Sequence, residues 1–178
     1  MLAGQVADAI IARGLPGRVT LSHLCVLSTL NPKIAGELIK KLARAEVTVV
    51  ALPETNLYLQ ERERGEAAPM RRGLAPIREL RAAGIDVRLG TDNVRDWFFP
   101  FGDADMLDTA LVAAISAHLD DEAELMAAIC GGRRAIEEGA PADLVLVRGS
   151  SFDDALARRS SDRTVFKAGR QVAGMARV

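Results

Sequence analysis

Apolar and polar positions in this chain follow two periods, one typical of strands and the other typical of helices. Three short runs predict strands: residues 19–23, which end in a polar pair, and the apolar runs 47–52 and 85–89, which have the composition of buried strands. The middle run is nearly continuous and β-branched, which predicts a strand buried on both faces. The segments between the runs are long enough for helices. The pattern therefore predicts repeated strand–helix units around a parallel sheet.

Helical spacing and capping residues mark the segments between and after these strands. Residues 2–12 predict a helix that ends in the Gly- and Pro-containing stretch 14–17. Asn31 and Pro32 are typical of a helix start. The apolar stripe predicted for that helix is Ile34, Leu38 and Leu42. Three more helices are predicted: one marked by Leu74, Ile77 and Leu80 and closed by Gly84, one over 105–119, and one from Asp120 or Asp121 to Gly131.

The pattern changes after about residue 140, where short strands replace the strand–helix rhythm. Residues 142–147 predict one strand, and residues 164–172 predict a hairpin that turns at Ala168-Gly169-Arg170. A small β appendage is therefore expected at this end of the chain. The charged stretch 61–72, which contains Arg71 and Arg72, is typical of a solvated loop.

Polar side chains follow each of the three predicted parallel strands. Ser22 and His23 end the first strand, residues 54–56 follow the second, and residues 91–93 follow the third. The carboxyl ends of parallel strands lie on one face of an α/β fold, so these loops are expected to build one site. Within it, Glu54 is more typical of a surface turn than of a ligand.

His23 and Asp92 are the two side chains of this site that are best suited to bind a metal or to transfer a proton. A histidine offers a metal-ligand nitrogen or a general base near neutral pH. An aspartate at a strand end can bind a cation and accept a proton from a bound water molecule. The alternative interpretation is structural: a hydrogen-bonded histidine and an aspartate that caps a helix or holds a turn.

An aromatic loop follows the third predicted strand. Four of the seven aromatic residues of the chain lie in it: Trp97, Phe98, Phe99 and Phe101. They could line a binding site for a flat heteroaromatic ligand, or they could pack the loop against the hydrophobic core. We expect two residues in each role. Asn93 could hydrogen-bond a ring amide or hold its own turn.

Composition excludes several classes of function. The 178 residues carry 23 basic and 24 acidic side chains, so neither a nucleic-acid partner nor a membrane anchor is indicated. Cys25 and Cys130, far apart in the sequence, predict two buried thiols in a reducing compartment. With no long apolar run and no signal-peptide pattern, a cytoplasmic location is expected. The usual markers of nucleotide-binding loops and serine hydrolases are absent from the sequence.

Eight short sequence segments, taken in order, resemble the carboxyl-terminal part of the amidohydrolase superfamily in its cytosine deaminase branch. They cover nearly the whole chain: VTLSH at 19–23, PETNLYLQ at 53–60, RRG at 71–73, GTDNV at 90–94, PFG at 100–102, DML at 105–107, GAPADLV at 139–145 and KAGR at 167–170.

The resemblance implies an α/β fold, a partial (β/α)8 TIM-type barrel with strands six to eight and their helices in residues 1–138. A short β-sandwich segment would occupy residues 139–178. Members of this branch use metal-activated water to hydrolyse a C–N bond of a small planar N-heterocycle.

The resemblance also implies roles for five residues. His23 would orient the metal-bound water or the substrate, and Asp92 would bind one divalent metal, zinc or iron, and shuttle a proton. Asn93, Trp97 and Phe98 would contact the planar ring.

The family's amino-terminal metal ligands have no counterpart here. The chain has two histidines in all and no His-x-His pair. We therefore expect a fragment of a larger enzyme, or a chain completed as a homo-oligomer or by a missing amino-terminal half, with little activity alone. One alternative is a non-catalytic remnant that binds a partner chain or a planar ligand. Another is a flavodoxin-like domain that binds a small anion, although no convincing phosphate cradle is present.

Overall fold

A parallel three-stranded sheet lies at the centre of the larger part of the molecule. The computed structural model describes residues 2–60 and 73–174. The sheet consists of β1 (Thr20–Ser22), β2 (Thr48–Ala51) and β3 (Asp86–Leu89), in the order β1-β2-β3. Val49 of β2 pairs with Leu21 on one side and Val87 on the other. All three strands therefore end at the same edge of the sheet.

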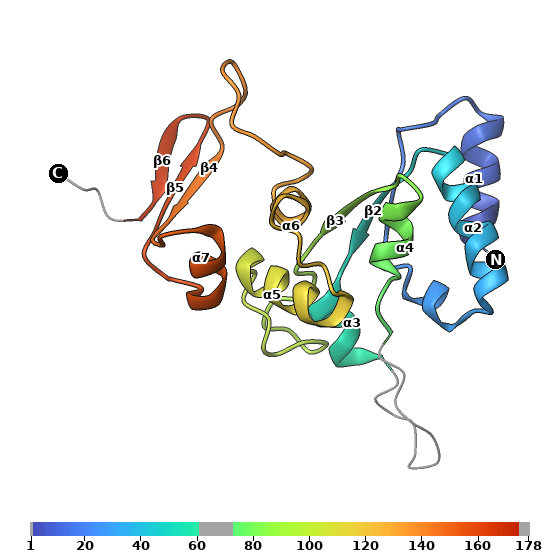
Figure 1. Cartoon of the computed structure of the whole chain (residues 1–178), viewed down its shortest axis with the longest axis horizontal. Helices are drawn as coiled ribbons and strands as arrows, with labels where there is room; N and C mark the ends of the chain where they lie inside the picture. Colours follow the sequence, from blue (N-terminus) through green and yellow to red (C-terminus); the bar gives the residue numbers. More distant parts are fainter. Residues whose placement is uncertain (1, 61–72, 175–178) are drawn as a thin grey trace, which may run out of the picture.

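Helices flank this sheet in the strand–helix order that the sequence predicts. Helices α1 and α2 lie side by side at one end of the molecule, α4 contacts β3, and α5 and α6 lie between the parallel sheet and the second sheet (Figure 1). The bounds are α1 (Leu2–Ala12), a 3₁₀ helix η1 (Cys25–Thr29), α2 (Pro32–Arg44), α3 (Pro53–Leu59), α4 (Ile77–Ala82), α5 (Met106–Ala117) and α6 (Glu122–Ile129).

The hydrophobic core lies where these helices meet the sheet. Val49 and Val87 contribute the centre of the sheet, and both are almost fully buried. Leu42 of α2 and Leu80 of α4 pack into the same core and are inaccessible to solvent. Burying such side chains stabilises the fold by about 1.5–3 kcal/mol each.

The second sheet is antiparallel and is formed by the last part of the described chain. It consists of β4 (Leu144–Val147), β5 (Arg163–Lys167) and β6 (Arg170–Ala173), with α7 (Phe152–Arg158) between β4 and β5. The β5–β6 turn places Ala168 and Gly169 at φ 48° and 76°, as a two-residue hairpin turn of type I′ requires. The predicted hairpin and its turn are therefore confirmed.

Most predicted elements are present, and the caps explain their bounds. The side chain of Asn31 accepts a hydrogen bond from the Lys33 N–H, and Pro32 occupies the first turn of α2. Asp105 and Asp121 cap α5 and α6 in the same way. The mixed α/β character of the fold is thus confirmed. The predicted loop at 61–72, with Arg71 and Arg72, lies outside the described residues.

Some predictions about burial are wrong. Ile34 is 54% exposed, and the buried side chains of α2 are Ile39 and Leu42. Cys130 is exposed, since it lies just beyond the last turn of α6. Only one face of β2 is fully buried.

Two of the described α-helices were not predicted. Helix α3 begins where a turn was predicted after β2, because Pro53 at its first position favours a helix start. Helix α7, capped by Ser151, lies in a stretch too short to show a clear period. Among the described helices, none has the length and apolar character needed to cross a membrane.

One ion pair links the second sheet to α5, and its loss should destabilise the fold. Arg163 of β5 donates two hydrogen bonds to Asp105, at 2.9 and 2.6 Å. Burial alone would raise the pKa of Asp105, but the hydrogen bonds from Arg163 and the Leu107 N–H hold it below its ordinary range. Asp105→Asn keeps the helix cap and loses the ion pair, so it should lower the free energy of unfolding by about 1–3 kcal/mol.

Urea denaturation at neutral and acidic pH checks this prediction. The difference between wild type and Asp105→Asn should shrink as the pH falls through the acidic range, because protonation of Asp105 removes the same interaction. Lys40→Gln, which breaks an exposed pair with Glu37 on α2, is the control and should leave stability unchanged. Equal effects of the two substitutions would contradict the prediction.

Candidate functional site

The first turn of α3 lies at the edge where the three parallel strands end. β2 ends at Ala51, and α3 begins two residues later at Pro53. Thr55 and Asn56 in this turn are 2% and 3% exposed. Their polar side chains contact the loops that follow β3 and β1, respectively. Helix α3 therefore connects the two neighbouring strand ends to the end of β2.

His23 is held at the end of β1 by its backbone and by its ring. Its N–H donates to the Val50 carbonyl at 3.0 Å, which continues the pairing of β1 with β2. Its Nδ1 lies 3.1 Å from Nδ2 of Asn56. An amide nitrogen can only donate, so this orientation of the amide matches a neutral ring with its proton on Nε2, and the reverse orientation would match the other tautomer. The side chain itself is exposed to solvent.

The other end of the Asn56 amide is unsatisfied. Within the part of the chain that the structure describes, its Oδ1 is buried and has no hydrogen-bond partner. A buried unpaired carbonyl costs about 1–3 kcal/mol of stability.

Asp92 is exposed at the end of β3, and the peptide groups on either side of it are held by Thr55. The Thr55 hydroxyl donates to the Thr91 carbonyl at 3.4 Å and accepts from the Asn93 N–H at 3.3 Å. Asp92 has a φ of 64°, a left-handed conformation that residues other than Gly seldom adopt. Thr55 therefore holds both neighbours of a residue in an unusual conformation.

Asn93 hydrogen-bonds within its own loop. Its Nδ2 donates to Asp96 at 2.6 Å, and Asp96 also accepts from the N–H groups of Phe98 and Phe99, both at 2.9 Å. These hydrogen bonds, that from Asn93 first, hold the pKa of Asp96 below its ordinary range. Asn93 thus shapes the start of the aromatic loop.

The aromatic loop is anchored at one end and open at the other. Tyr58 of α3 contacts Phe99 and Phe101, with ring centroids 4.9 and 5.9 Å apart. Trp97 is fully exposed, and Phe98 is 64% exposed. Tyr58 had no predicted role, because nothing in the sequence indicates that α3 reaches this loop. The anchor leaves the faces of Trp97 and Phe98 accessible to a ligand.

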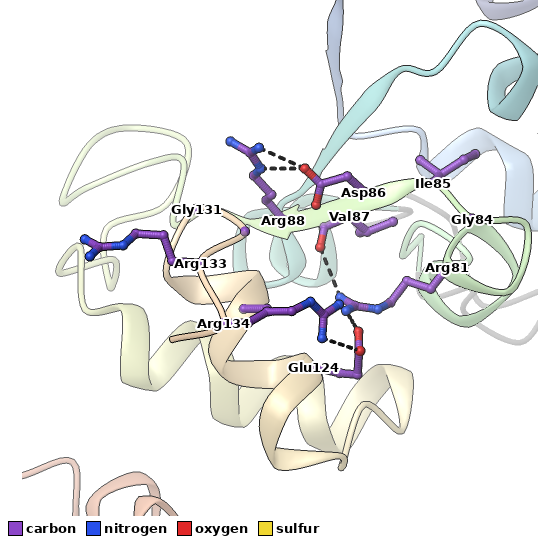
Figure 2. Close-up of a pocket in the computed structure, with 12 residues that line it drawn as sticks. Arg81, Gly84, Ile85, Asp86, Val87, Arg88, Glu124, Gly131, Arg133 and Arg134 are labelled. Carbon is purple, nitrogen blue, oxygen red and sulfur yellow. Dashed lines mark hydrogen bonds and ion pairs between the residues drawn. The ribbon is translucent and has the colours of Figure 1, made fainter. Parts of the chain in front are cut away.

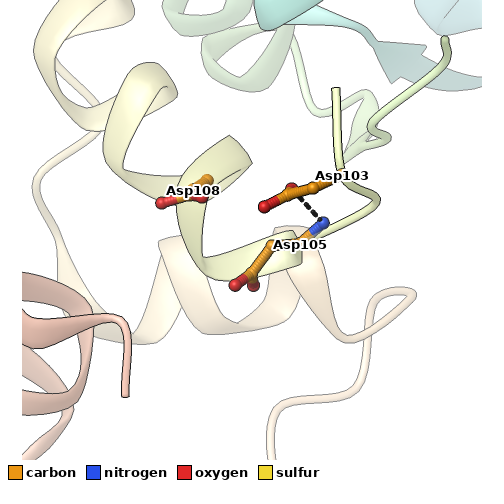
Figure 3. Close-up of side chains that lie close together, drawn as sticks. All are labelled: Asp103, Asp105 and Asp108. Carbon is orange, nitrogen blue, oxygen red and sulfur yellow. Dashed lines mark hydrogen bonds between the residues drawn. The ribbon is translucent and has the colours of Figure 1, made fainter. Parts of the chain in front are cut away.

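The described residues do not complete a metal site around Asp92. Among them, one group of three carboxylates lies within 4.8 Å: Asp103, Asp105 and Asp108, at the start of α5 (Figure 3). Asp105 is paired with Arg163, and Asp108 is paired with Arg159. At the strand ends, Asp92 offers one carboxylate, while Nδ1 of His23 is already engaged by Asn56. A catalytic zinc ion takes three protein ligands, so this donor set fits only part of such a site.

A cavity of about 810 Å³ lies elsewhere, beside β3 and the end of α6 (Figure 2). Three of its four arginines are in ion pairs: Arg81 and Arg134 both pair with Glu124, and Arg88 pairs with Asp86. The fourth, Arg133, donates to the Asp143 carbonyl. Burial, together with the charge of Arg134, lowers the pKa of Arg81. This cavity is a charge-paired surface depression and contains none of the predicted site residues.

Glu54 was predicted to lie in a surface turn, and this prediction is wrong. It lies in the first turn of α3, half-buried, and its carboxylate accepts from the Thr109 hydroxyl at 3.2 Å. Burial raises the pKa of Glu54 to about 7, opposed by the Thr109 hydrogen bond and assisted by the charges of Asp108, Asp103 and Asp105. The sequence holds no signal of this, since α5 and its aspartates are about 50 residues away.

Glu54 should make the fold less stable as the pH rises. The folded state binds more protons than the unfolded state between about 4.5 and about 7, so stability is lost across that range. Glu54→Gln keeps an acceptor for Thr109 and should raise the free energy of unfolding at about pH 8 by on the order of 1 kcal/mol, after allowance for solvent screening. Urea denaturation at two pH values measures this. A gain that is the same at about pH 5 and at about pH 8 would contradict the prediction. The control is Glu79→Gln, because the side chain of Glu79 is exposed to solvent.

Known proteins resemble this chain in sequence and in fold. A model of the amidohydrolase family matches residues 1–173. The pterin deaminase of Rhizobium rhizogenes is 35% identical over 179 residues, which cover 94% of this chain and 40% of that protein. The crystal structure of 5-methylcytosine deaminase from Klebsiella pneumoniae with 5-fluorocytosine matches with a TM-score of 0.84 at 22% identity, over 98% of this chain and 45% of that one.

A second solved structure matches over a similar range. N-isopropylammelide isopropylaminohydrolase from Burkholderia multivorans has a TM-score of 0.73 and 27% identity, over 97% of this chain and 43% of that one. The chain therefore spans less than half the length of each of these three relatives. The family match covers nearly the whole chain, and the chain belongs to the amidohydrolase family.

Proposed function

We propose that this chain provides part of the active site of a deaminase-type amidohydrolase, which hydrolyses a C–N bond of a small planar N-heterocycle. The main support for the proposal is that α3 joins two strand ends through hydrogen bonds. Asn56 contacts the ring of His23, and the Thr55 hydroxyl bonds both peptide groups that flank Asp92. These loops lie at the carboxyl edge of a parallel sheet, where α/β enzymes place their chemistry.

In this proposal the parallel sheet corresponds to strands six to eight of a (β/α)8 barrel. Residues 1–138 would form this part of the barrel, and residues 139–178 a β-sandwich segment. The likeness in fold to 5-methylcytosine deaminase, with a TM-score of 0.84, supports the assignment. The chain would act as a homo-oligomer or together with a separate amino-terminal half.

The names of the relatives support the proposed substrate class. Their names indicate action on a pterin, on 5-methylcytosine and on N-isopropylammelide. Each of these compounds is a flat nitrogen heterocycle, and hydrolysis releases an exocyclic amine. The exposed faces of Trp97 and Phe98 are suited to stacking on such a ring, and both side chains are accessible.

His23 and Asp92 have complementary roles in the proposal. With Nδ1 engaged by Asn56, His23 presents an Nε2–H donor that can orient an oxygen of the substrate or of the attacking water. The Asp92 carboxylate can accept a proton at the same edge of the sheet. Asp92 would also be one ligand of a zinc or iron ion, which when bound would supply an activated water. Asn93, engaged with Asp96, would contribute by shaping the loop.

A non-catalytic role is the second candidate, and one observation favours it. The described residues place no group of three metal ligands around Asp92. A chain of this kind could retain the stacking surface and bind a planar ring or a partner chain without turning a substrate over.

Ammonia release distinguishes the two candidates. The purified chain is incubated with zinc or iron(II) and with pterin, cytosine or 5-methylcytosine, and ammonia and the product mass are measured. The proposal predicts release with at least one ring, from the homo-oligomeric chain or from the chain combined with an amino-terminal half, and a loss of at least about 100-fold in Asp92→Asn. Asp120→Asn, an exposed aspartate before α6, is the matched control and should retain full activity.

Two outcomes would contradict the proposal. Full activity in Asp92→Asn would remove Asp92 from the reaction. Tight binding of a ring without release of ammonia, with every metal and in every oligomeric state, would favour the non-catalytic role.

A further inference from the structure

We infer that Thr55 and Asn56, adjacent in the first turn of α3, are the positioning residues of the candidate site: Asn56 holds His23 as the Nε2–H tautomer, and Thr55 holds the backbone on both sides of Asp92. The inference rests on the proposed function, which gives His23 and Asp92 their roles. Both positioning side chains are almost fully buried, so they act through their neighbours and do not touch the substrate.

The backbone explains why these two residues need support. His23 and Asp92 have φ values of 67° and 64°, in the left-handed region that side chains with a Cβ seldom occupy. Such conformations persist where surrounding contacts hold them. Here the contacts come from consecutive residues of one helical turn.

The orientation of the Asn56 amide sets the tautomer that we propose for His23. In the structure Nδ2 lies 3.1 Å from Nδ1 of His23, and Oδ1 is buried without a partner among the described residues. A donor at this place pairs with an unprotonated Nδ1, so the matching ring proton is on Nε2.

Fixing the tautomer decides what His23 can do. A ring with its proton on Nε2 presents a hydrogen-bond donor to solvent and to any bound ring, while its acceptor nitrogen is turned toward Asn56. Thr55 contributes in a parallel way, since its hydroxyl bonds the carbonyl before Asp92 and the N–H after it. A displacement of about 1 Å of a reacting group can cost about 100-fold in rate, so both contacts bear directly on catalysis.

NMR of the histidine rings tests the role of Asn56. The chain contains two histidines, so a two-bond ¹H–¹⁵N spectrum of labelled protein shows only His23 and His118, and His118 at the end of α5 is an internal reference. At mildly alkaline pH, His23 should show its proton on Nε2. Asn56→Asp replaces the donor by an acceptor and should move the proton to Nδ1. A proton on Nδ1 in the wild type, or an unchanged spectrum in Asn56→Asp, would overturn the inference for Asn56.

Hydrogen exchange tests the role of Thr55. Thr55→Val keeps the shape and removes the hydroxyl, so exchange of the Asn93 N–H should quicken by at least about fivefold. Thr55→Ser should restore protection, and neither change should alter the His23 spectrum. If Thr55→Val does not fold, Thr55→Ala takes its place in the same comparison. Unchanged exchange at Asn93 in a folded variant would overturn the inference for Thr55.

These measurements need no substrate, so they separate this inference from the proposed function. A chain without deaminase activity can still show the expected tautomer and exchange rates. In an active preparation, Thr55→Val should lower kcat with little change in KM, and Thr55→Ser should recover it, as expected for a positioning residue. Activity that is retained in Thr55→Val despite faster exchange would show that this contact does not position Asp92 for catalysis.

Discussion

The hydrogen bonds made by one turn of α3 are the interactions on which the candidate site depends. Thr55 contacts the loop after β3, and Asn56 contacts the ring of His23 after β1. Since α3 itself follows β2, this turn ties together the ends of three parallel strands. Tyr58, further along the same helix, anchors the aromatic loop through Phe99 and Phe101. A short helix thus organises all the segments in which the site residues lie.

The rest of the fold supports that arrangement from outside. Helix α5 packs on α3, with Glu54 accepting from Thr109 across their contact. The ion pair of Asp105 with Arg163 joins α5 to the antiparallel sheet. The second sheet is thus connected to α5 by one charged pair, and α5 to α3 by a contact that includes one partly buried carboxylate.

Much of the fold could be predicted from the sequence, because apolar periodicity and capping residues act locally. Asn31 and Pro32 start α2 as predicted, and the three parallel strands lie within the predicted runs. The polar residues at the three strand ends also lie at one edge of the sheet, as expected for parallel strands. The roles of Thr55, Asn56, Tyr58 and Glu54 could not be predicted, since each depends on a partner about 30 to 55 residues away. Periodicity carries no information about such contacts.

In the proposed function, a planar ring binds where α3 joins the strand ends. A titration of ¹⁵N-labelled chain with pterin, followed by backbone amide shifts, tests this directly. The largest changes should fall on the amides of His23, Asn93, Trp97 and Phe98, with small changes at Thr55 and Asn56. Changes confined to the charge-paired cavity around Arg81 and Arg134, with the strand ends unaffected, would contradict it.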